Sequence, residues 1–400
     1  MTTQIRAGFL PLIDAAILIA AREMGFAEEH GIDLSLVRET SWANVRDRLA
    51  VGHFDAAHIL APMPIAANLG LTAIGQTLIV PMALGLGGNA ITVSNDLHAS
   101  LGSPPQGQPA ESAEALARYI ESHRETRLRF AVVHPFSAHN IELRYWLAAG
   151  GISPDQDVDI VVLPPALVPD ALAARTIEGY CVGEPWNTVA VLAGTGKILT
   201  TKSAIWASSP EKVLAVSDQI ARTDMDLVHR IIRALTQSAQ WCAASDNADA
   251  LAELLSRADY LAKAKGDIIS ALLGPAAYEP FHGAATFPWQ SHALWLYSQM
   301  VRWQMAEHSA ENAELAASTY RPDIYRSALA ATDVPVPTAN AKVEGALQSS
   351  AHVGAKSGGQ DSALLMGPDG FFDNRKFDPD RLEDYLRAQS NSSPSADLHI

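Results

Sequence analysis

Apolar runs separated by polar breaks predict a chain in which short strands alternate with helices. In the first part of the chain, Gly or Pro residues end most of the runs. The predicted elements are strands at residues 4–9, 31–39 and 56–60, with a first helix that Asp14 can cap and Gly25 ends, a second at residues 42–51 and a third after Pro62. Because this alternation is typical of parallel sheets, it predicts an α/β layer with helices on both faces.

The same alternation starts again after residues 99–112, a loop rich in Pro, Gly and Ser. The second series has strands at 127–133, 158–163 and 178–182, with helices at 139–149 and 166–174. Residues 197–202 and 212–217 are expected to be strands that return to the first lobe, and residues 224–305 are largely helical. A ligand of such a fold binds between the lobes, where strands end and helices begin.

The order of elements predicts that one lobe is inserted into the other. We expect a first lobe of residues 1–92 plus 213–330 and a second lobe of residues 93–212, joined by a hinge. After Ala328 the chain becomes rich in Ala, Ser, Gly and Pro. Residues 331–400 are therefore predicted to be a linker and a C-terminal tail that packs on the surface, with a helix from Asp380.

Composition and charge exclude several classes of protein. The 400 residues are 48% hydrophobic and 18% charged, which suffices for a full core. The 29 basic and 44 acidic residues give a net charge of −15, which argues against a broad surface for nucleic acid or anionic membrane. It does not argue against one local anion site. We expect no direct contact with nucleic acid.

Motifs for metal binding and catalysis are missing from the sequence. Cys181 and Cys242 are too few for a disulfide framework or a cysteine zinc site, and the 13 histidines form no HExxH motif. A GxSxG elbow and a Walker A loop are also absent, and the glycines of GLGGNA do not complete a dinucleotide loop. We therefore expect a binding protein without metal or cofactor rather than an enzyme.

The first residues of the chain are relevant to the cellular compartment of the protein. Residues 7–21 are apolar, but they include Pro11 and Asp14 and fall short of the ~20 apolar residues that a membrane span needs. Arg6 alone is a weak basic region for a signal peptide. We expect no membrane insertion and a cytoplasmic protein; a leader removed from the chain would instead place it in the periplasm.

Several polar or small residues stand at helix starts, after strands, in a glycine-rich loop, at a crossover or, for His58, inside a predicted strand. They are Trp42, His58, Gly88, Asn89, His139, Glu184, Trp186 and Lys212. Singly, each has an ordinary structural explanation, such as core packing for Trp42, a helix cap for Glu184 or a surface position for Lys212. Together they suit a small planar anion, which needs in-plane donors, an apolar wall and a cation. Helix N-termini at Trp42 and His139 would add N–H donors, and we expect His139 to be neutral there.

Six ordered motifs carry a resemblance to a known family. SWANVRD, DAAHILAPMP, GNAIT, LRYWLAAGGI, CVGEPWN and PEKVL resemble segments of the nitrate-binding and bicarbonate-binding solute proteins of bacterial ABC importers. The resemblance implies a two-lobed periplasmic-binding-protein fold with two hinge crossovers. It also implies ligand contacts at Trp42, Gly88, Asn89, His139 and Lys212, with His58, Glu184 and Trp186 as a second group.

The resemblance leaves two main functions open. The missing leader and lipid-anchor cysteine resemble the cytoplasmic nitrate/nitrite sensors of the NasS type, which control an RNA-binding antiterminator partner of the ANTAR type in nitrate assimilation. The alternative is the solute-binding component of a nitrate or bicarbonate ABC importer. His139 and Lys212 favour nitrate or nitrite, because a cation without a nearby acid suits an anion that carries no proton. An enzyme on the same fold is a third hypothesis.

Overall fold

The strands of the computed structural model, which describes residues 2–73, 75–353 and 364–390, lie mainly in two five-stranded sheets. The first sheet contains, in spatial order, β2 (Ile32–Arg38), β1 (Thr3–Phe9), β3 (Ala56–Leu60), β11 (Lys212–Ser217) and β4 (Leu78–Ala83). The second contains β10 (Gly196–Thr201), β6 (Asn89–Ser94), β9 (Gly179–Gly183), β7 (Leu128–Val132) and β8 (Val158–Val162). Two short pairs, β5 (Leu86–Gly87) with β12 (Tyr278–Glu279) and β13 (Ala351–Val353) with β14 (Leu364–Met366), complete the strands of the described residues.

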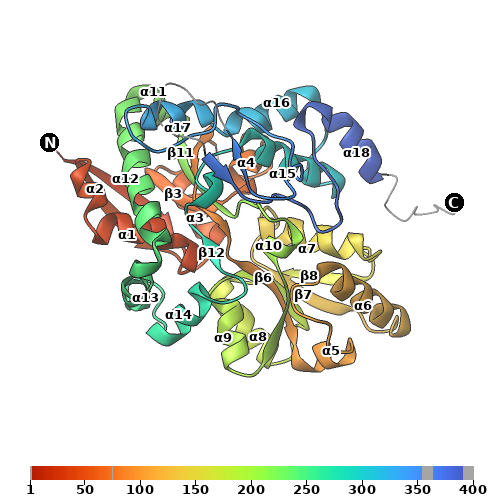
Figure 1. Ribbon diagram of the computed structural model, residues 1–400. Helices are drawn as coiled ribbons and strands as arrows, with labels where there is room; N and C mark the ends of the chain where they lie inside the picture. The colour runs from red at the N-terminus through yellow and green to blue at the C-terminus, as the bar shows by residue number, and fades with distance from the viewer. Residues whose placement is uncertain (1, 74, 354–363, 391–400) are drawn as a thin grey trace.

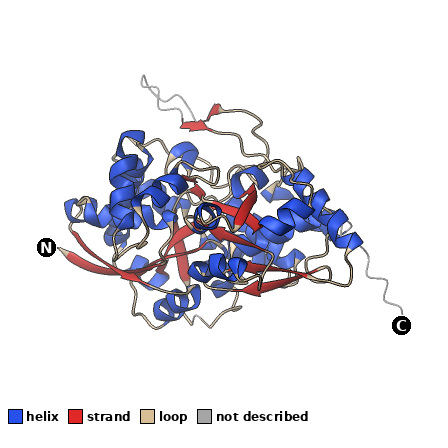
Figure 2. Cartoon of the chain, turned by 90° about the horizontal axis from the view of Figure 1, so that it is seen from below, coloured by secondary structure: helices blue, strands red, loops and turns tan. Residues whose placement is uncertain are grey.

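Helices surround each sheet and define the two lobes seen in Figure 1. Around the first sheet lie α1 (Ala16–Glu23), α2 (Phe26–Glu29), α3 (Trp42–Ala50), α4 (Pro62–Asn68), α11 (Asp218–Thr223), α12 (Met225–Ala243), α13 (Ala248–Ser256), α14 (Lys265–Leu272), α15 (Gln290–Arg302), α16 (Ala310–Thr319) and α17 (Pro322–Leu329). Around the second lie α5 (Asn95–Ser100), α6 (Pro109–Ser122), α7 (Ala138–Ala149), α8 (Val168–Ala173), α9 (Trp186–Leu192) and α10 (Lys202–Ile205). Figure 2 shows the strands between these helices, which confirms the predicted α/β layering.

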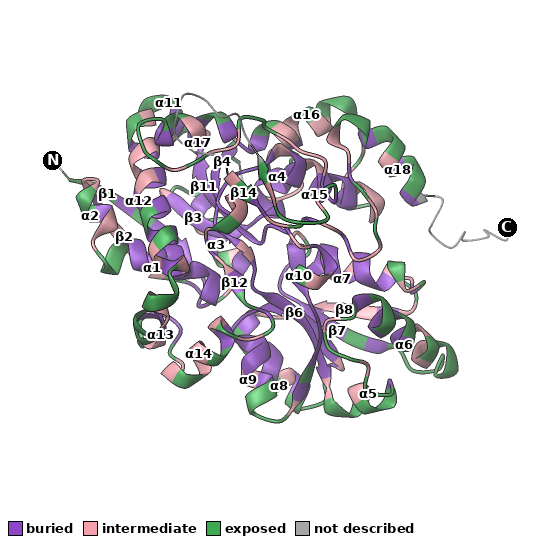
Figure 3. Ribbon diagram, in the orientation of Figure 1, coloured by how far each residue is buried: buried purple, intermediate pink, exposed green. Residues whose placement is uncertain are grey.

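The burial of residues follows this arrangement of sheets and helices. The central strands are buried and the outer faces of the peripheral helices are exposed (Figure 3). Strands β3, β4, β9 and β11 are buried along their whole length. Strands covered on both faces lose the alternation of apolar and polar residues, which explains why these segments are mostly apolar and show no alternation.

Both sheets are mixed, which corrects the prediction of parallel sheets. Strand β11 runs antiparallel to β3 and β4, and β6 runs antiparallel to β9 and β10. Strands β6 and β11 follow the two crossings between the lobes. They therefore enter their sheets from the other lobe rather than through a helical crossover, and no βαβ unit fixes a parallel direction for them.

The two crossings between the lobes can be compared with the predicted lobe boundaries. Residues 197–202 do not return to the first lobe as expected, because β10 pairs with β6 in the second sheet and only β11 returns. Strand β6 begins at Asn89, so it spans the predicted boundary between residues 92 and 93. The division into residues 1–92 plus 213–330, 93–212 and 331–400 stays a prediction.

The end of the chain lies across the seam between the lobes. We call residues 341–353 and 364–377 the C-terminal strap. Phe371 of the strap stacks on Trp206 with ring centroids 4.9 Å apart, while Tyr145 of α7 donates to Asp373 Oδ2 over 2.8 Å. The helix expected from Asp380 is α18 (Leu382–Ser390), which packs on α15. Residues 354–363 and 391–400 of the predicted tail lie outside the described residues.

Candidate functional site

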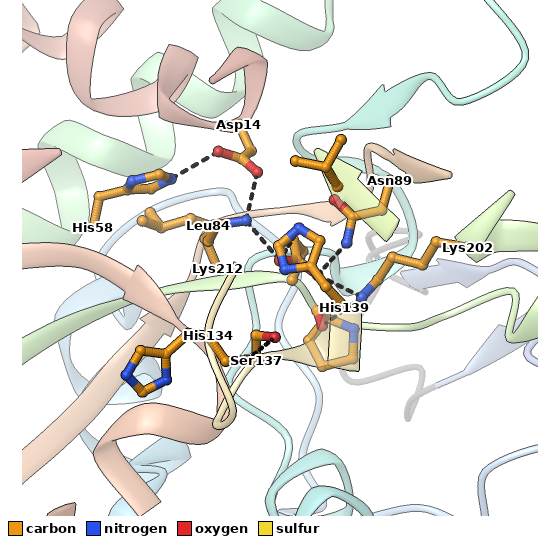
Figure 4. A network of polar contacts seen from close by, with 12 residues as sticks. Asp14, His58, Leu84, Asn89, His134, Ser137, His139, Lys202 and Lys212 are labelled. Atoms are coloured by element: carbon orange, nitrogen blue, oxygen red, sulfur yellow. Dashed lines mark hydrogen bonds and ion pairs between the residues drawn. The ribbon is translucent and has the colours of Figure 1, made fainter. Parts of the chain in front are cut away.

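A continuous series of buried ion pairs lies where the two sheets meet (Figure 4). Lys212 Nζ donates to Asp14 Oδ2 over 2.9 Å and to Glu211 Oε1 over 2.6 Å. Lys202 Nζ lies 2.8 Å from Glu211 Oε2 and 2.8 Å from Glu142 Oε1. Each of these five residues is at most 2% exposed. We call them, with His58, Asn89, His139 and Ser209, the polar cluster.

The first lobe contributes one half of the polar cluster. His58 Nε2 on β3 lies 2.9 Å from Asp14 Oδ1, and the Trp42 ring lies 5.1 Å from Lys212 Nζ. Trp42 is the first residue of α3, whose N-cap Ser41 accepts from Asn44 N. Burial alone would raise the pKa of Asp14, but Lys212 and His58 lower it, so this carboxylate stays charged.

The second lobe contributes the other half. His139 lies in the first turn of α7, after the N-cap Ser137, as the sequence predicted. Its Nε2 atom lies 3.3 Å from Glu211 Oε1, and Asn89 Nδ2, at the start of β6, donates to Glu211 Oε2 over 2.5 Å. Burial lowers the pKa of His139 to about 3, so its imidazole is neutral at physiological pH.

Glu211 lies at the centre of the cluster. Its carboxylate faces two ammonium groups, one amide and one imidazole, and the residue is fully buried. Burial alone would raise its pKa, but the surrounding His139, Lys202 and Lys212 hold it well below the ordinary glutamate value. In contrast, burial raises the pKa of Glu142 to about 7.

Several buried polar atoms around the cluster have no hydrogen-bond partner among the described residues. They are Trp42 Nε1, His58 Nδ1, Asn89 Oδ1, and both ring nitrogens of His139. Unsatisfied buried donors and acceptors are rare in folded proteins, and they are enriched where a ligand or an ordered water binds. The cluster therefore combines two buried cations with unused donors.

The structure brings together most of the predicted site residues. Trp42, Asn89, His139 and Lys212 all belong to or contact the polar cluster, and His58 joins it through Asp14. Gly88 shows no contact with the cluster among the described residues, and a Cβ atom on it would lie 3.4 Å from Tyr278 Cβ. Its φ of +79° and its hydrogen bonds to Ala277 and Glu184 instead fix the course of the chain into β6.

Glu184 and Trp186 have other partners. The Glu184 carboxylate accepts from Thr188 N over 3.0 Å and from Thr188 Oγ1 over 3.1 Å, so it caps the first turn of α9. The Trp186 ring lies 4.6 Å from Lys263 Nζ. Neither shows a contact with the polar cluster among the described residues, and their place in the second group stays a prediction.

The sequence analysis missed Asp14, Lys202, Glu142 and Glu211. Asp14 was expected to cap a helix, but it lies inside the short helix Ile13–Ala15 and pairs with Lys212. An ionisable residue within an apolar run needs a buried partner, and that was the available signal. Glu211 also corrects the expectation that Lys212 has no acid nearby, since the two side chains form an ion pair.

No group of His, Cys, Asp and Glu within the described ranges is arranged to hold a metal ion. None of the helices in the part of the chain that the structure describes combines the length and apolar character that a membrane crossing requires.

These features define a class of protein: two mixed α/β sheets joined by two crossings, with a buried polar site between them, form the two-lobed periplasmic-binding-protein fold. The model of the NMT1-like family matches residues 1–256. This is more than half of the 400 residues, so the chain belongs to the NMT1-like family.

Individual relatives refine this comparison. The crystal structure of the periplasmic nitrate-binding protein NrtA from Synechocystis PCC 6803 matches with a TM-score of 0.82 and 26% identity, over 97% of this chain and 98% of that one. The nitrate/nitrite binding protein NrtA of Nostoc sp. PCC 7120 is 28% identical over 97% of this chain and 86% of its own length. The bicarbonate transport ATP-binding protein CmpC of Synechocystis is 36% identical over 74% of this chain, which spans only 45% of CmpC.

Proposed function

We propose that this chain is a solute-binding protein that takes up nitrate or nitrite between its lobes, as the binding component of an ABC importer. The observation that carries the proposal is the likeness to NrtA, which extends over 97% of the chain in both sequence and structure. The polar cluster supplies the matching chemistry at the seam of the lobes. We therefore assign binding, not catalysis, to this site.

The proposed ligand site uses the residues that surround the two lysines. Lys212 supplies the charge, while Asn89 and neutral His139 supply directed donors from the other lobe. The Trp42 ring and its unpartnered Nε1 form the wall. A buried monoanion needs such charge-assisted hydrogen bonds to offset the loss of its hydration. Because donors come from both lobes, binding would favour the closed arrangement.

Calorimetric titration of the purified chain with nitrate, nitrite and bicarbonate tests the proposal. We expect saturable heat with nitrate or nitrite. A chain that binds neither anion, while remaining folded by circular dichroism, would contradict the proposal.

Bicarbonate is the second candidate ligand. The observation that favours it is the Glu211 carboxylate beside Lys212, because an acceptor next to a cation suits an anion that carries its own O–H group. The likeness to CmpC points in the same direction. Bicarbonate heat without nitrate heat in the same titration would select this candidate.

The predicted sensor role remains a hypothesis with its own test. Relatives named for import and transport, such as CmpC, support the importer function over the sensor function. A tagged chain expressed with its natural start is expected in the periplasmic fraction. Recovery in the cytoplasm, together with a co-purified RNA-binding antiterminator that nitrate releases, would instead support the sensor.

A further inference from the structure

The polar cluster contains no surplus of positive charge for an incoming anion. Lys202 and Lys212 are its two cations, and three carboxylates face them: Asp14, Glu142 and Glu211. Even with Glu142 protonated, the remaining two carboxylates balance the two ammonium groups. Adding nitrate to this arrangement would bury an uncompensated negative charge, which is strongly unfavourable.

Glu211 differs from the other two carboxylates in its partners. Of the two lysines, Asp14 pairs only with Lys212 and Glu142 only with Lys202, whereas Glu211 pairs with both. It also takes the side-chain donor of Asn89 and lies 3.3 Å from His139 Nε2. These donors come from both lobes and converge on one planar, negatively charged group with trigonal oxygens.

We propose that Glu211 is a resident anion: its carboxylate occupies the donors of the anion site, and a ligand binds by displacing it. This inference rests on the proposed function, because it uses the same site. Glu211 would then set the affinity of the site for its ligand. Its carboxylate is part of the chain and has a high effective concentration in the site, so every ligand must compete with it.

The test compares nitrate binding by the wild-type chain and by Glu211→Gln, which keeps the shape of the side chain and removes its charge. We expect Glu211→Gln to melt at a lower temperature without ligand, because two buried lysines lose a shared partner. We expect it to bind nitrate at least about tenfold more tightly, and nitrate to raise its melting temperature more than that of the wild type. Equal or weaker binding would overturn the inference.

Glu344→Gln is the matched control. Glu344 is also fully buried, pairs with Lys342 and has a pKa lowered to about 2, where burial is outweighed by Lys342 and His292. It lies in the C-terminal strap and shows no contact with the polar cluster's carboxylates or lysines among the described residues. We expect this variant to lose stability but to keep its nitrate affinity within about twofold.

The outcomes separate the two proposals. If the wild type binds nitrate and Glu211→Gln binds no better, Glu211 is a structural ion-pair partner and only the inference fails. If only Glu211→Gln binds, the inference holds and nitrate is not the natural ligand. If neither folded protein binds, both proposals fail.

A second variant covers the case in which Glu211→Gln does not fold. Glu211→Asp keeps the charge but shortens the side chain, so its carboxylate cannot reach both lysines as well. It should also bind nitrate more tightly than the wild type. Failure of both variants to fold in saturating nitrate would overturn the inference, because the ion should then replace the missing carboxylate.

Discussion

At the scale of single residues, the molecule is distinguished by lysines that are fully buried and paired with carboxylates. Lys212 is 0% exposed and bridges Asp14 and Glu211. Burial alone would lower the pKa of Lys202, but Glu142 and Glu211 raise it above its ordinary value. Buried lysines keep their charge only where carboxylates surround them, so each lysine defines a place where an anion is stabilised.

Replacement of Lys212 by Ala is expected to weaken nitrate binding by at least ~1.5 kcal/mol, or about tenfold in the dissociation constant. The reason is the loss of a charge-assisted hydrogen bond in a fully buried site. Calorimetric titration measures this directly. Lys342→Ala is the control, since Lys342 pairs with Glu344 and Asp369 in the strap. Unchanged affinity in Lys212→Ala would remove Lys212 from the site.

Sequence reasoning identified the donors of the site better than its acceptors. Trp42, His139 and Lys212 stand at strand ends or helix starts, and these positions follow from the order of the elements. Asp14 and Glu211 become site residues only because the chain returns from the second lobe and places β11 beside β3. That pairing joins residues far apart in the chain, and no local pattern encodes it.

At the scale of elements, helix α9 begins at the seam between the lobes, with a buried carboxylate beside its first turn. Helix α9 starts at Trp186, and Glu184 accepts from the backbone and hydroxyl of Thr188. Glu184 O also accepts from Ile13 N over 2.9 Å, so this turn joins the two lobes. Burial raises the pKa of Glu184 to about 7 from an ordinary value of 4.5.

This cap gives the stability of the protein a defined pH dependence. Between pH 4.5 and about 7 the Glu184 carboxyl keeps its proton in the folded protein but has lost it in the unfolded chain. The contribution of Glu184 to stability therefore falls as the pH rises through this window and levels off above it. Glu184→Gln should remove up to about 3 kcal/mol of that decline. Urea unfolding at the two ends of the window measures the difference, and identical slopes in variant and wild type would contradict it.

The sequence predicted the elements that a local pattern specifies, but not the strand directions and sheet membership that depend on strand pairing. The strands and helices of both series appear close to their predicted positions, because periodicity and turn residues specify them. The direction of β6 and β11, and the sheet to which β10 belongs, depend on how the chain crosses between the lobes. Apolar runs of this length carry no information about strand direction.

At the scale of the whole molecule, the C-terminal strap adds contacts that neither sheet provides. Phe371 packs on Trp206 and Trp295, with centroid distances of 4.9 and 5.5 Å, and Tyr145 of α7 lies 5.8 Å away. Glu344 accepts from Ser291 of α15 over 2.6 Å and from Ser208, between α10 and β11, over 3.2 Å. The strap thus contacts the first lobe, the second lobe and a crossing between them.

Removal of the Phe371 ring should therefore lower the stability of the protein. Phe371→Ala is expected to lower the free energy of unfolding by about 3–5 kcal/mol, because Phe371 is 4% exposed and its removal leaves a cavity among aromatic rings. Leu365→Ala in the same strap is the control: Leu365 is 52% exposed, and its replacement should change stability by about 0.5 kcal/mol or less. Equal effects of the two replacements in urea unfolding would show that the strap is only a surface covering.

The placement of β11 also sets an order for folding during synthesis. Strands β2, β1 and β3 leave the ribosome first, but β4 has β11 as its neighbour in the sheet, and β11 follows the whole second sheet in the chain. The second sheet, built from consecutive residues 89–201, can close while the first still exposes the edge of β3. Exposed strand edges invite pairing with other chains. The nascent protein is thus most open to aggregation, and most in need of a chaperone, until Lys212–Ser217 emerges and joins the two halves of its first sheet.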